Sequence, residues 1–193
     1  MGRVFNAVVD YLTEDDWKFT VLEGDGAFVL SFRGKAGSWQ CFGRADEEKE
    51  CFTFYSILPP HAPEDKRLKV AEFVTRANYG LIIGNFELDF RDGQVRYKTS
   101  IDIEGGELTH KMVENLIYAN LTTMDDYFPG FMSVMYGDRE PAEAIDEIEG
   151  KGRARPPAAD EDDYHLEDLD EDEAGEGDDK DKGFGSARDL GIE

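Results

Sequence analysis

The sequence predicts an α+β fold: one antiparallel sheet, made of a four-strand meander plus a hairpin, with three helices, followed by a disordered acidic tail. Between residues 19 and 102, apolar and polar residues alternate around two Asp-Gly pairs, which is typical of half-buried strands. Apolar residues at helical spacing precede, divide and follow these strands. Both periodicities end near residue 150. We therefore expect an α+β domain at residues 1–146 and a tail at residues 147–193.

The first helix is predicted near the start of the chain. Phe5, Val8, Val9 and Leu12 recur at helical spacing and would form one apolar stripe. The acidic run TEDD follows, and we expect the helix to stop before it.

The meander is predicted from its turns. Asp25-Gly26 suits the two central positions of a tight hairpin turn, and GKAG at residues 34–37 suits the next turn. The cross-strand pairs that follow all lie on one face: Val21 with Leu30, Phe19 with Phe32, Phe32 with Trp39, and Leu30 with Cys41.

The third connection, RADEEKE, leaves two registers open. Pairing Cys41 with Cys51 would allow a cross-strand disulfide. Pairing Cys41 with Phe52 and Trp39 with Phe54 would keep the large side chains on the core face. We favour the second register, because burying two phenylalanine rings contributes several kcal/mol.

A second helix is expected to begin at Pro63-Glu64-Asp65. Proline suits the first helical position, and acids in the first turn are favoured by the helix dipole. The sequence Asn78-Tyr79-Gly80 is expected to end this helix. Its apolar stripe comprises Val70, Phe73, Val74 and Ala77.

The stretch GNFELDFRDGQVRYKTSID, residues 84–102, predicts a hairpin around Asp92-Gly93. With these two residues as the loop, apolar pairs share one face: Phe90 with Val95, Leu88 with Tyr97, and Phe86 with Thr99. Opposite charges pair on the other face: Asp89 with Arg96 and Glu87 with Lys98. A one-residue slip would move every side chain to the other face, so we expect a sheet that is packed on one face and solvated on the other.

The third helix is predicted from an apolar stripe that comprises Val113, Leu116, Ile117, Leu121, Met124 and Phe128. Asp125 and Asp126 are expected in a solvated turn beside Pro129. Pro129-Gly130 is expected to kink or break the helix before residues 131–136.

The net charge of −23 excludes several partners. Residues 1–150 carry −13 and residues 151–193 carry −10. This sign of charge repels phosphate backbones and anionic membrane surfaces, so neither nucleic acid nor membrane is an expected partner. The sequence has no apolar run of ~18 residues that could span a bilayer and no secretory signal, so we expect the cytoplasm.

The tail is expected to be disordered, because it is highly charged and poor in aromatic residues. Within it, YHLEDLDEDE at residues 164–173 places Tyr164, Leu166 and Leu169 among acids. This pattern resembles an acidic-hydrophobic docking segment that folds onto a basic groove. The alternative is a tail that only keeps the protein soluble.

No catalytic, cofactor-binding or metal-binding set of residues is predicted. His61, His110 and His165 have no partner set in the sequence, and we expect them to be solvated or capping residues. No nucleophile motif or phosphate-binding loop occurs. Two cysteines are too few for a disulfide framework.

A second hypothesis is an enzyme or a small-ligand-binding protein. Its pocket would lie between the second helix and the sheet. Such a pocket would be lined by convergent polar groups such as Arg76, Asn78 and Asp102.

The stretch RANYGLIIGNFELDFRDGQVRYKTSID resembles the YbjN-domain family. The similarity rests on Arg76, Asn78, Gly84, Phe86, Glu87, Asp92-Gly93, Arg96-Tyr97, Ser100 and Asp102. It extends upstream to Tyr55 and the prolines at 59–60, and downstream to Tyr127-Phe128-Pro129 and residues 140–144. It covers about residues 1–146, and the acidic tail lies outside it.

The resemblance implies a fold similar to type III secretion chaperones, often dimeric, and a role as a bacterial sensory transduction regulator without enzymatic activity. Gly84 and Gly93 would permit special backbone geometry, Phe86 would fill the core, Glu87 would pair with Lys98, and Asn78 would help to end a helix.

We therefore expect a non-catalytic protein-binding module, chaperone-like or regulatory, in bacterial signalling or stress response. It would need no cofactor, and its partner would be another protein or a second copy of the chain.

Overall fold

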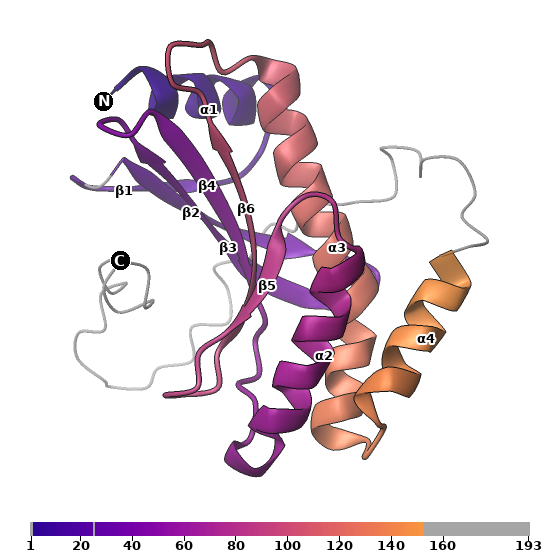
Figure 1. The fold of residues 1–193 in the computed structure, drawn as a ribbon. Helices are drawn as coiled ribbons and strands as arrows, with labels where there is room; N and C mark the ends of the chain where they lie inside the picture. Colours follow the sequence, from indigo (N-terminus) through magenta and orange to yellow (C-terminus); the bar gives the residue numbers. More distant parts are fainter. Residues whose placement is uncertain (1, 25, 153–193) are drawn as a thin grey trace, which may run out of the picture.

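The computed structural model describes residues 2–24 and 26–152 and confirms the α+β fold (Figure 1). Within these residues, six strands form one antiparallel sheet in the order β1-β2-β3-β4-β6-β5. The strands are β1 (Thr20–Leu22), β2 (Ala27–Arg33), β3 (Ser38–Asp46), β4 (Cys51–Ile57), β5 (Asn85–Leu88) and β6 (Val95–Asp102). The helices are α1 (Arg3–Glu14), α2 (Arg67–Gly80), α3 (His110–Tyr136) and α4 (Pro141–Gly152), with a short 3-10 turn, η1 (Glu64–Lys66), before α2.

The helices lie on one side of the sheet. Helices α1, α2 and α3 contact the strands, and α4 packs outside them against α2 and α3 (Figure 1). The core fills the space between these layers, and each large side chain buried there contributes roughly 1.5–3 kcal/mol. Its largest members come from alternate strand positions and inward helix faces, namely Phe5, Tyr11, Phe28, Phe52, Phe54, Phe73, Phe86, Tyr97 and Phe131.

The predicted faces are correct, although most of the predicted registers are not. The β2–β3 register is confirmed, with Phe32 opposite Trp39 and Leu30 opposite Cys41. Three registers differ from the prediction by an even number of residues, and an even shift leaves each side chain on its predicted face. The observed pairs are Val21 with Phe28, Cys41 with Ser56, Phe86 with Tyr97, and Leu88 with Val95.

The β5–β6 hairpin departs from the prediction because its loop is longer than two residues. Gly93 has a φ of 86°, but Asp92 does not have a positive φ, so the expected two-residue turn does not form. Instead, the Gly93 amide donates to the Asp89 carbonyl at 2.8 Å, and the Ala62 amide donates to the Gly93 carbonyl at 2.7 Å. A side chain at position 93 would collide with Ala62. Contact with the chain before α2 therefore sets this loop, and Phe90 lies in it, exposed rather than on the core face.

The β3–β4 connection is also set by a distant contact. The Glu47 carboxylate accepts the amide hydrogens of Val4 at 3.1 Å and Phe5 at 2.8 Å, so it caps the start of α1. Strand β3 therefore extends to Asp46, and Cys51 lies opposite Asp46 rather than Cys41. Both cysteines are free thiols, and the alternative with a disulfide is wrong.

Helices α1 and α2 follow their predicted stripes. Phe5, Val8 and Leu12 are buried on α1. The predicted stripe of α2 is buried along its whole length, and α2 ends at Gly80 as expected. The acids after Pro63 form the 3-10 turn η1 rather than the first turn of α2 itself.

Helix α3 continues through Pro129, so of the expected kink or break the break does not occur. An interior proline costs roughly 3 kcal/mol, so packing must offset that cost. At the next residue, a side chain on Gly130 would overlap Phe73 of α2 and Ile148 of α4, which shows how closely the neighbouring helices enclose α3 there. The enclosing side chains hold the helical path on both sides of the proline.

Helix α4 was not predicted, and the described residues therefore form four α-helices rather than three. Its apolar residues are few, chiefly Ala144, Ile145 and Ile148. The helix runs to Gly152, past the expected boundary at residue 146. No described helix has the length and apolar character needed to cross a bilayer.

Asp125 lies inside α3 and is buried, so the expected solvated turn is wrong. Its carboxylate accepts the amide hydrogens of Lys35 at 2.9 Å and Ala36 at 2.8 Å. The side chain therefore ties the turn between β2 and β3 to the middle of α3.

Candidate protein-binding surface

One face of the sheet points away from all four helices, and we call it the open face (Figure 1). Its side chains alternate with the core residues along β2, β3, β4, β6 and β5. Those that matter below are Val29, Arg33, Gln40, Phe42, Arg44, Tyr55, Ile57, Glu87, Arg96 and Lys98.

A row of four residues crosses the middle of the open face. Val29 of β2 lies opposite Phe42 of β3, Phe42 opposite Tyr55 of β4, and Tyr55 opposite Lys98 of β6. The Phe42 and Tyr55 rings are 6.3 Å apart, and with Ala27 they form an apolar cluster separate from the main core. The row is therefore apolar at its centre, where Phe42 is buried and Tyr55 is 9% exposed, and cationic toward β6.

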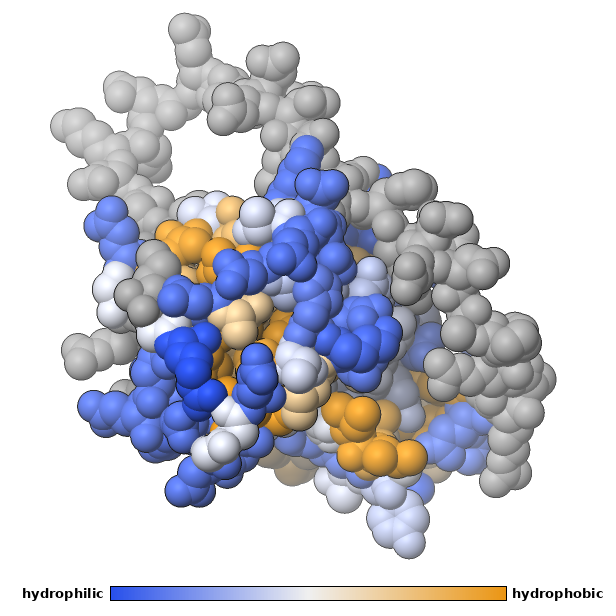
Figure 2. All heavy atoms as spheres, turned by 90° about the horizontal axis from the view of Figure 1, so that it is seen from above, coloured by the Kyte–Doolittle hydropathy of each residue, from blue (hydrophilic) through white to orange (hydrophobic). Residues whose placement is uncertain are grey.

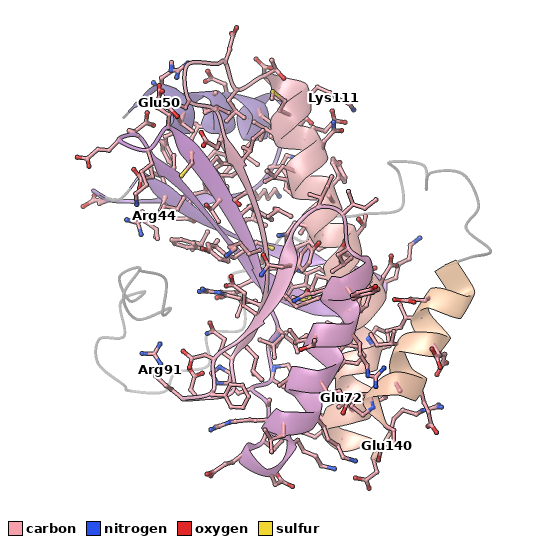
Figure 3. All side chains as sticks on the ribbon, viewed as in Figure 1. Arg44, Glu50, Glu72, Arg91, Lys111 and Glu140 are labelled. Atoms are coloured by element: carbon pink, nitrogen blue, oxygen red, sulfur yellow. The ribbon has the colours of Figure 1, made fainter. Side chains whose placement is uncertain are left out.

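Cationic side chains surround this apolar centre. The Arg96 guanidinium lies 4.7 Å from the centre of the Tyr55 ring, within the range of a cation–π contact. Burial of Tyr55 raises the pKa of its hydroxyl. Arg44 of β3 and Arg91 of the β5–β6 loop both project to the side of the sheet opposite α2, α3 and α4 (Figure 3). Arg44 forms no ion pair with the described carboxylates.

Glu87 binds both basic side chains of β6, Arg96 and Lys98. Its carboxylate accepts from Arg96 Nε at 2.7 Å and also from Lys98 Nζ. Burial alone would raise the pKa of Glu87, but the hydrogen bonds from Lys98 and Arg96 outweigh it and lower the pKa below its ordinary value. The predicted pairing of Glu87 with Lys98 is confirmed, and Arg96 joins it because the register is shifted.

A hollow of about 400 Å³ adjoins the open face where β2 and β4 end and β3 begins. Arg33, Gln40 and Ile57 line it from the strands, and Pro59 and His61 line it from the chain after β4. Its wall is mostly apolar with a few polar groups, which suits an apolar side chain presented by a partner.

A second apolar patch lies at the end of α2 and on the loop between α2 and β5. Tyr79 and Ile82 are each 97% exposed, and Ile83 is 50% exposed. Seen from above, most of the surface is hydrophilic, and apolar side chains reach it only in small separate areas (Figure 2). This patch is apolar but carries none of the cations that mark the open face.

The residues proposed for a pocket between α2 and the sheet do not converge. Arg76 pairs with Glu72 on the surface of α2, with Nε 2.8 Å from the carboxylate. Asn78 donates to the Phe86 carbonyl at 3.0 Å and accepts the Phe86 amide hydrogen at 2.7 Å, so it binds β5 rather than capping α2. Asp102 lies at the far end of β6, and its carboxylate accepts from the Glu104 amide. Phe73, Phe86, Tyr97, Tyr127 and Phe131 pack against one another between α2 and the sheet.

The other predicted residues have structural positions. Gly84 and Gly93 both have positive φ, at 79° and 86°, and Phe86 is buried, as expected from the resemblance. His110 packs edge-on against Tyr11, and its ring lies 3.1 Å from the Glu14 carboxylate. Burial raises the pKa of the Cys41 thiol to about 12. Among residues 2–24 and 26–152, no group of three His, Cys, Asp or Glu side chains is placed to hold a metal ion.

The predicted docking segment with Tyr164, Leu166 and Leu169 lies outside the described residues, as does His165. The alternation of residues correctly predicted that Glu87, Arg96 and Lys98 lie on the solvated face. It did not identify Phe42 and Arg44 as residues of that face. The signal that could have revealed Phe42 is the pair of adjacent apolar residues at positions 41 and 42. In a strand, these two side chains point to opposite faces, so one of them must lie outside the main core.

Residues 5–132 match the sequence profile of the YbjN family, whose description reads "Putative bacterial sensory transduction regulator". No curated protein matches the chain.

Three solved structures illustrate the structural similarity. YbjN from E. coli, described as "a putative transcription regulator", is 10% identical with a TM-score of 0.49; the match covers 64% of this chain and 89% of that one. A chain of the HopA1-SchA chaperone-effector complex is 16% identical with a TM-score of 0.47, covering 66% and 95%. A chain of the ExsC-ExsE complex is 13% identical with a TM-score of 0.44, covering 65% and 91%.

Proposed function

The chain belongs to the YbjN family, and from that premise we propose that it is a non-catalytic module that binds another protein through the open face. It would act in the cytoplasm of a bacterium, in signalling or in a stress response, and it would need no cofactor. The family description, a sensory transduction regulator, supports the regulatory part of this proposal.

The observation that carries the proposal is the composition of the open face. An apolar row with Phe42 and Tyr55 at its centre is bordered by Arg44, Arg96 and Lys98, beside a mostly apolar hollow. Interfaces are enriched in aromatic residues and arginine, which combine large contact area with directed hydrogen bonds. All four helices lie on the other face (Figure 1). Phe42 is buried and Tyr55 is only 9% exposed, so the groups that this face presents to a partner are chiefly its cations and the apolar hollow beside them.

The cations on the open face favour a protein with acidic and apolar side chains. Nucleic acid is also anionic, but the whole chain carries a charge of −23, and phosphate binding requires an extended basic surface. A short acidic-apolar peptide needs only the few cations that border Tyr55. The homodimer that the resemblance implies stays a prediction, and the patch around Ile82 is where we would seek its interface.

The proposal is tested with two charge reversals in the full chain. Arg44→Glu changes the open face, and Lys111→Glu makes the same change of charge near the start of α3, far from it (Figure 3). Immobilised wild-type protein and Lys111→Glu should retain the same protein from an extract of the host bacterium. Arg44→Glu should reduce its retention at least tenfold, or about 1.4 kcal/mol of binding free energy.

Two results would contradict this function. One is that no protein is enriched over an uncoupled matrix in repeated experiments. The other is that Arg44→Glu and Lys111→Glu retain the same proteins in the same amounts, which would place any binding elsewhere on the chain.

A further inference from the structure

The most acidic part of the chain follows the described domain. Residues 160–173 contain ten aspartates and glutamates and no lysine or arginine. The domain before them is also acidic, with a charge of −13 over residues 1–150. Most of the domain surface therefore repels this segment, and only a local group of cations can hold it.

The open face provides such a group. Five of the lysines and arginines of the domain lie on it or at the tip of its β5–β6 hairpin: Arg33, Arg44, Arg91, Arg96 and Lys98. Arg96 and Lys98 both bind the carboxylate of Glu87, Arg91 pairs with Asp89, and Arg44 has no ion pair with a described carboxylate. In Figure 3, Arg44 and Arg91 point to the same side of the sheet.

The apolar residues of the segment match the apolar parts of this face. Tyr164 and Leu166 alternate with polar residues, so in an extended conformation both side chains point the same way. The hollow of about 400 Å³ beside Ile57 offers apolar contacts next to the cations, whereas Phe42 is buried and Tyr55 is only 9% exposed. A segment that combines acids with Tyr164, Leu166 and Leu169 is complementary to both features.

The segment is long enough to reach the face. Eleven residues, 153–163, separate the end of α4 from Tyr164. In an extended chain these residues span up to about 40 Å. The end of α4 lies beside the end of α2, where a side chain at Gly80 would lie 3.5 Å from Glu149, and the chain after Gly80 leads into the edge strand β5. The path to the open face therefore runs around this edge and does not cross the whole domain. Because the segment belongs to the same chain, its binding to the face is an intramolecular step.

We propose that residues 160–173 dock on the open face of their own chain and compete there with the protein partner. This inference rests on the proposed function, since it assigns the same surface to both ligands. It also states the chemistry of that partner: an acidic segment with interspersed apolar residues, able to displace the segment that the chain carries itself.

The test uses the purified full chain with a photo-crosslinking amino acid at Gln40, which is exposed on the open face. We expect intramolecular crosslinks to residues 160–173 at a yield independent of protein concentration. Arg44→Glu should lower that yield at least threefold, and Lys111→Glu should not. Adding Asp168→Lys and Asp170→Lys to the Arg44→Glu chain should restore the crosslink yield, because charges on the segment are then reversed as well as the charge at position 44.

Other outcomes overturn the inference. Crosslinks only to a second copy of the chain, or to no part of residues 160–173, would show that the segment does not dock in cis. If Gln40 captures a bacterial protein in extract but never this segment, the inference fails while the proposed function stands. If Gln40 captures the segment and never another protein, the proposed function fails while docking stands.

Discussion

At the scale of single residues, Glu87 is the group whose charge matters most to the open face. It holds Arg96 and Lys98 in place, and these side chains in turn border Tyr55. The carboxylate is only 26% exposed, so its two hydrogen bonds are partly shielded from water. The sequence predicted the face on which Glu87 lies but not both of its partners.

We predict that Glu87→Gln lowers the free energy of unfolding by about 1–2 kcal/mol at pH 7, because two charge-assisted hydrogen bonds are weakened. The pKa of Glu87 is lowered in the folded protein, so its contribution is complete above the unfolded pKa of about 4.3 and is lost as pH falls through the folded pKa. Urea unfolding between pH 3 and pH 8 measures this difference.

Glu72→Gln is the matched control, since Glu72 pairs with Arg76 on the exposed surface of α2. Its effect should stay below about 0.5 kcal/mol. A Glu87→Gln effect that is as small, or that grows as the pH falls below 4, would contradict the role given to Glu87.

At the scale of strands and helices, contacts between residues far apart in the sequence determine the loop lengths and strand registers that local sequence patterns do not. The alternation of apolar residues fixed which face of each strand is buried, and those faces are as predicted for Phe86, Leu88 and Tyr97. Loop lengths were not predictable from two-residue turn signals. They depend on the contact of Gly93 with Ala62 and of Glu47 with the start of α1.

The same limit applies to the helices. Pro129 suggested a break in α3, but the packing of Phe73 and Ile148 beside Gly130 maintains the helix. Helix α4 has too few apolar residues to stand out as a periodic stripe, and its burial depends on α2 and α3. Tertiary packing, which no single window of sequence contains, decided both cases.

Asp125 connects two elements, and this connection is testable. Asp125→Ala removes the acceptor of the Lys35 and Ala36 amide hydrogens and should cost about 2–3 kcal/mol in the free energy of unfolding. Asp126→Ala makes the same change at an exposed neighbouring position of α3 and corrects for helix propensity. Chemical denaturation of both variants measures the difference. Equal effects of the two substitutions would show that the Asp125 carboxylate does not hold the β2–β3 turn.

At the scale of the whole molecule, the sheet divides the domain into two parts with different roles. One face, with the helices, contains the core that holds the fold together. The other face carries the apolar row and the cations that we propose as a binding surface. The general division into a packed face and a solvated face could be predicted from strand alternation. The position of Arg44 next to Phe42 and Tyr55 could not, because it depends on the register of β3 with β4.

The most direct test of the central claim compares two positions of one photo-crosslinking amino acid in the living bacterium. Gln40 places the probe on the open face, and Glu72 places it on the exposed side of α2. We predict that Gln40 captures a defined protein partner, that Glu72 does not, and that Arg44→Glu abolishes the capture at Gln40. Capture of the same partner from Glu72, with none from Gln40, would show that the partner does not bind the open face.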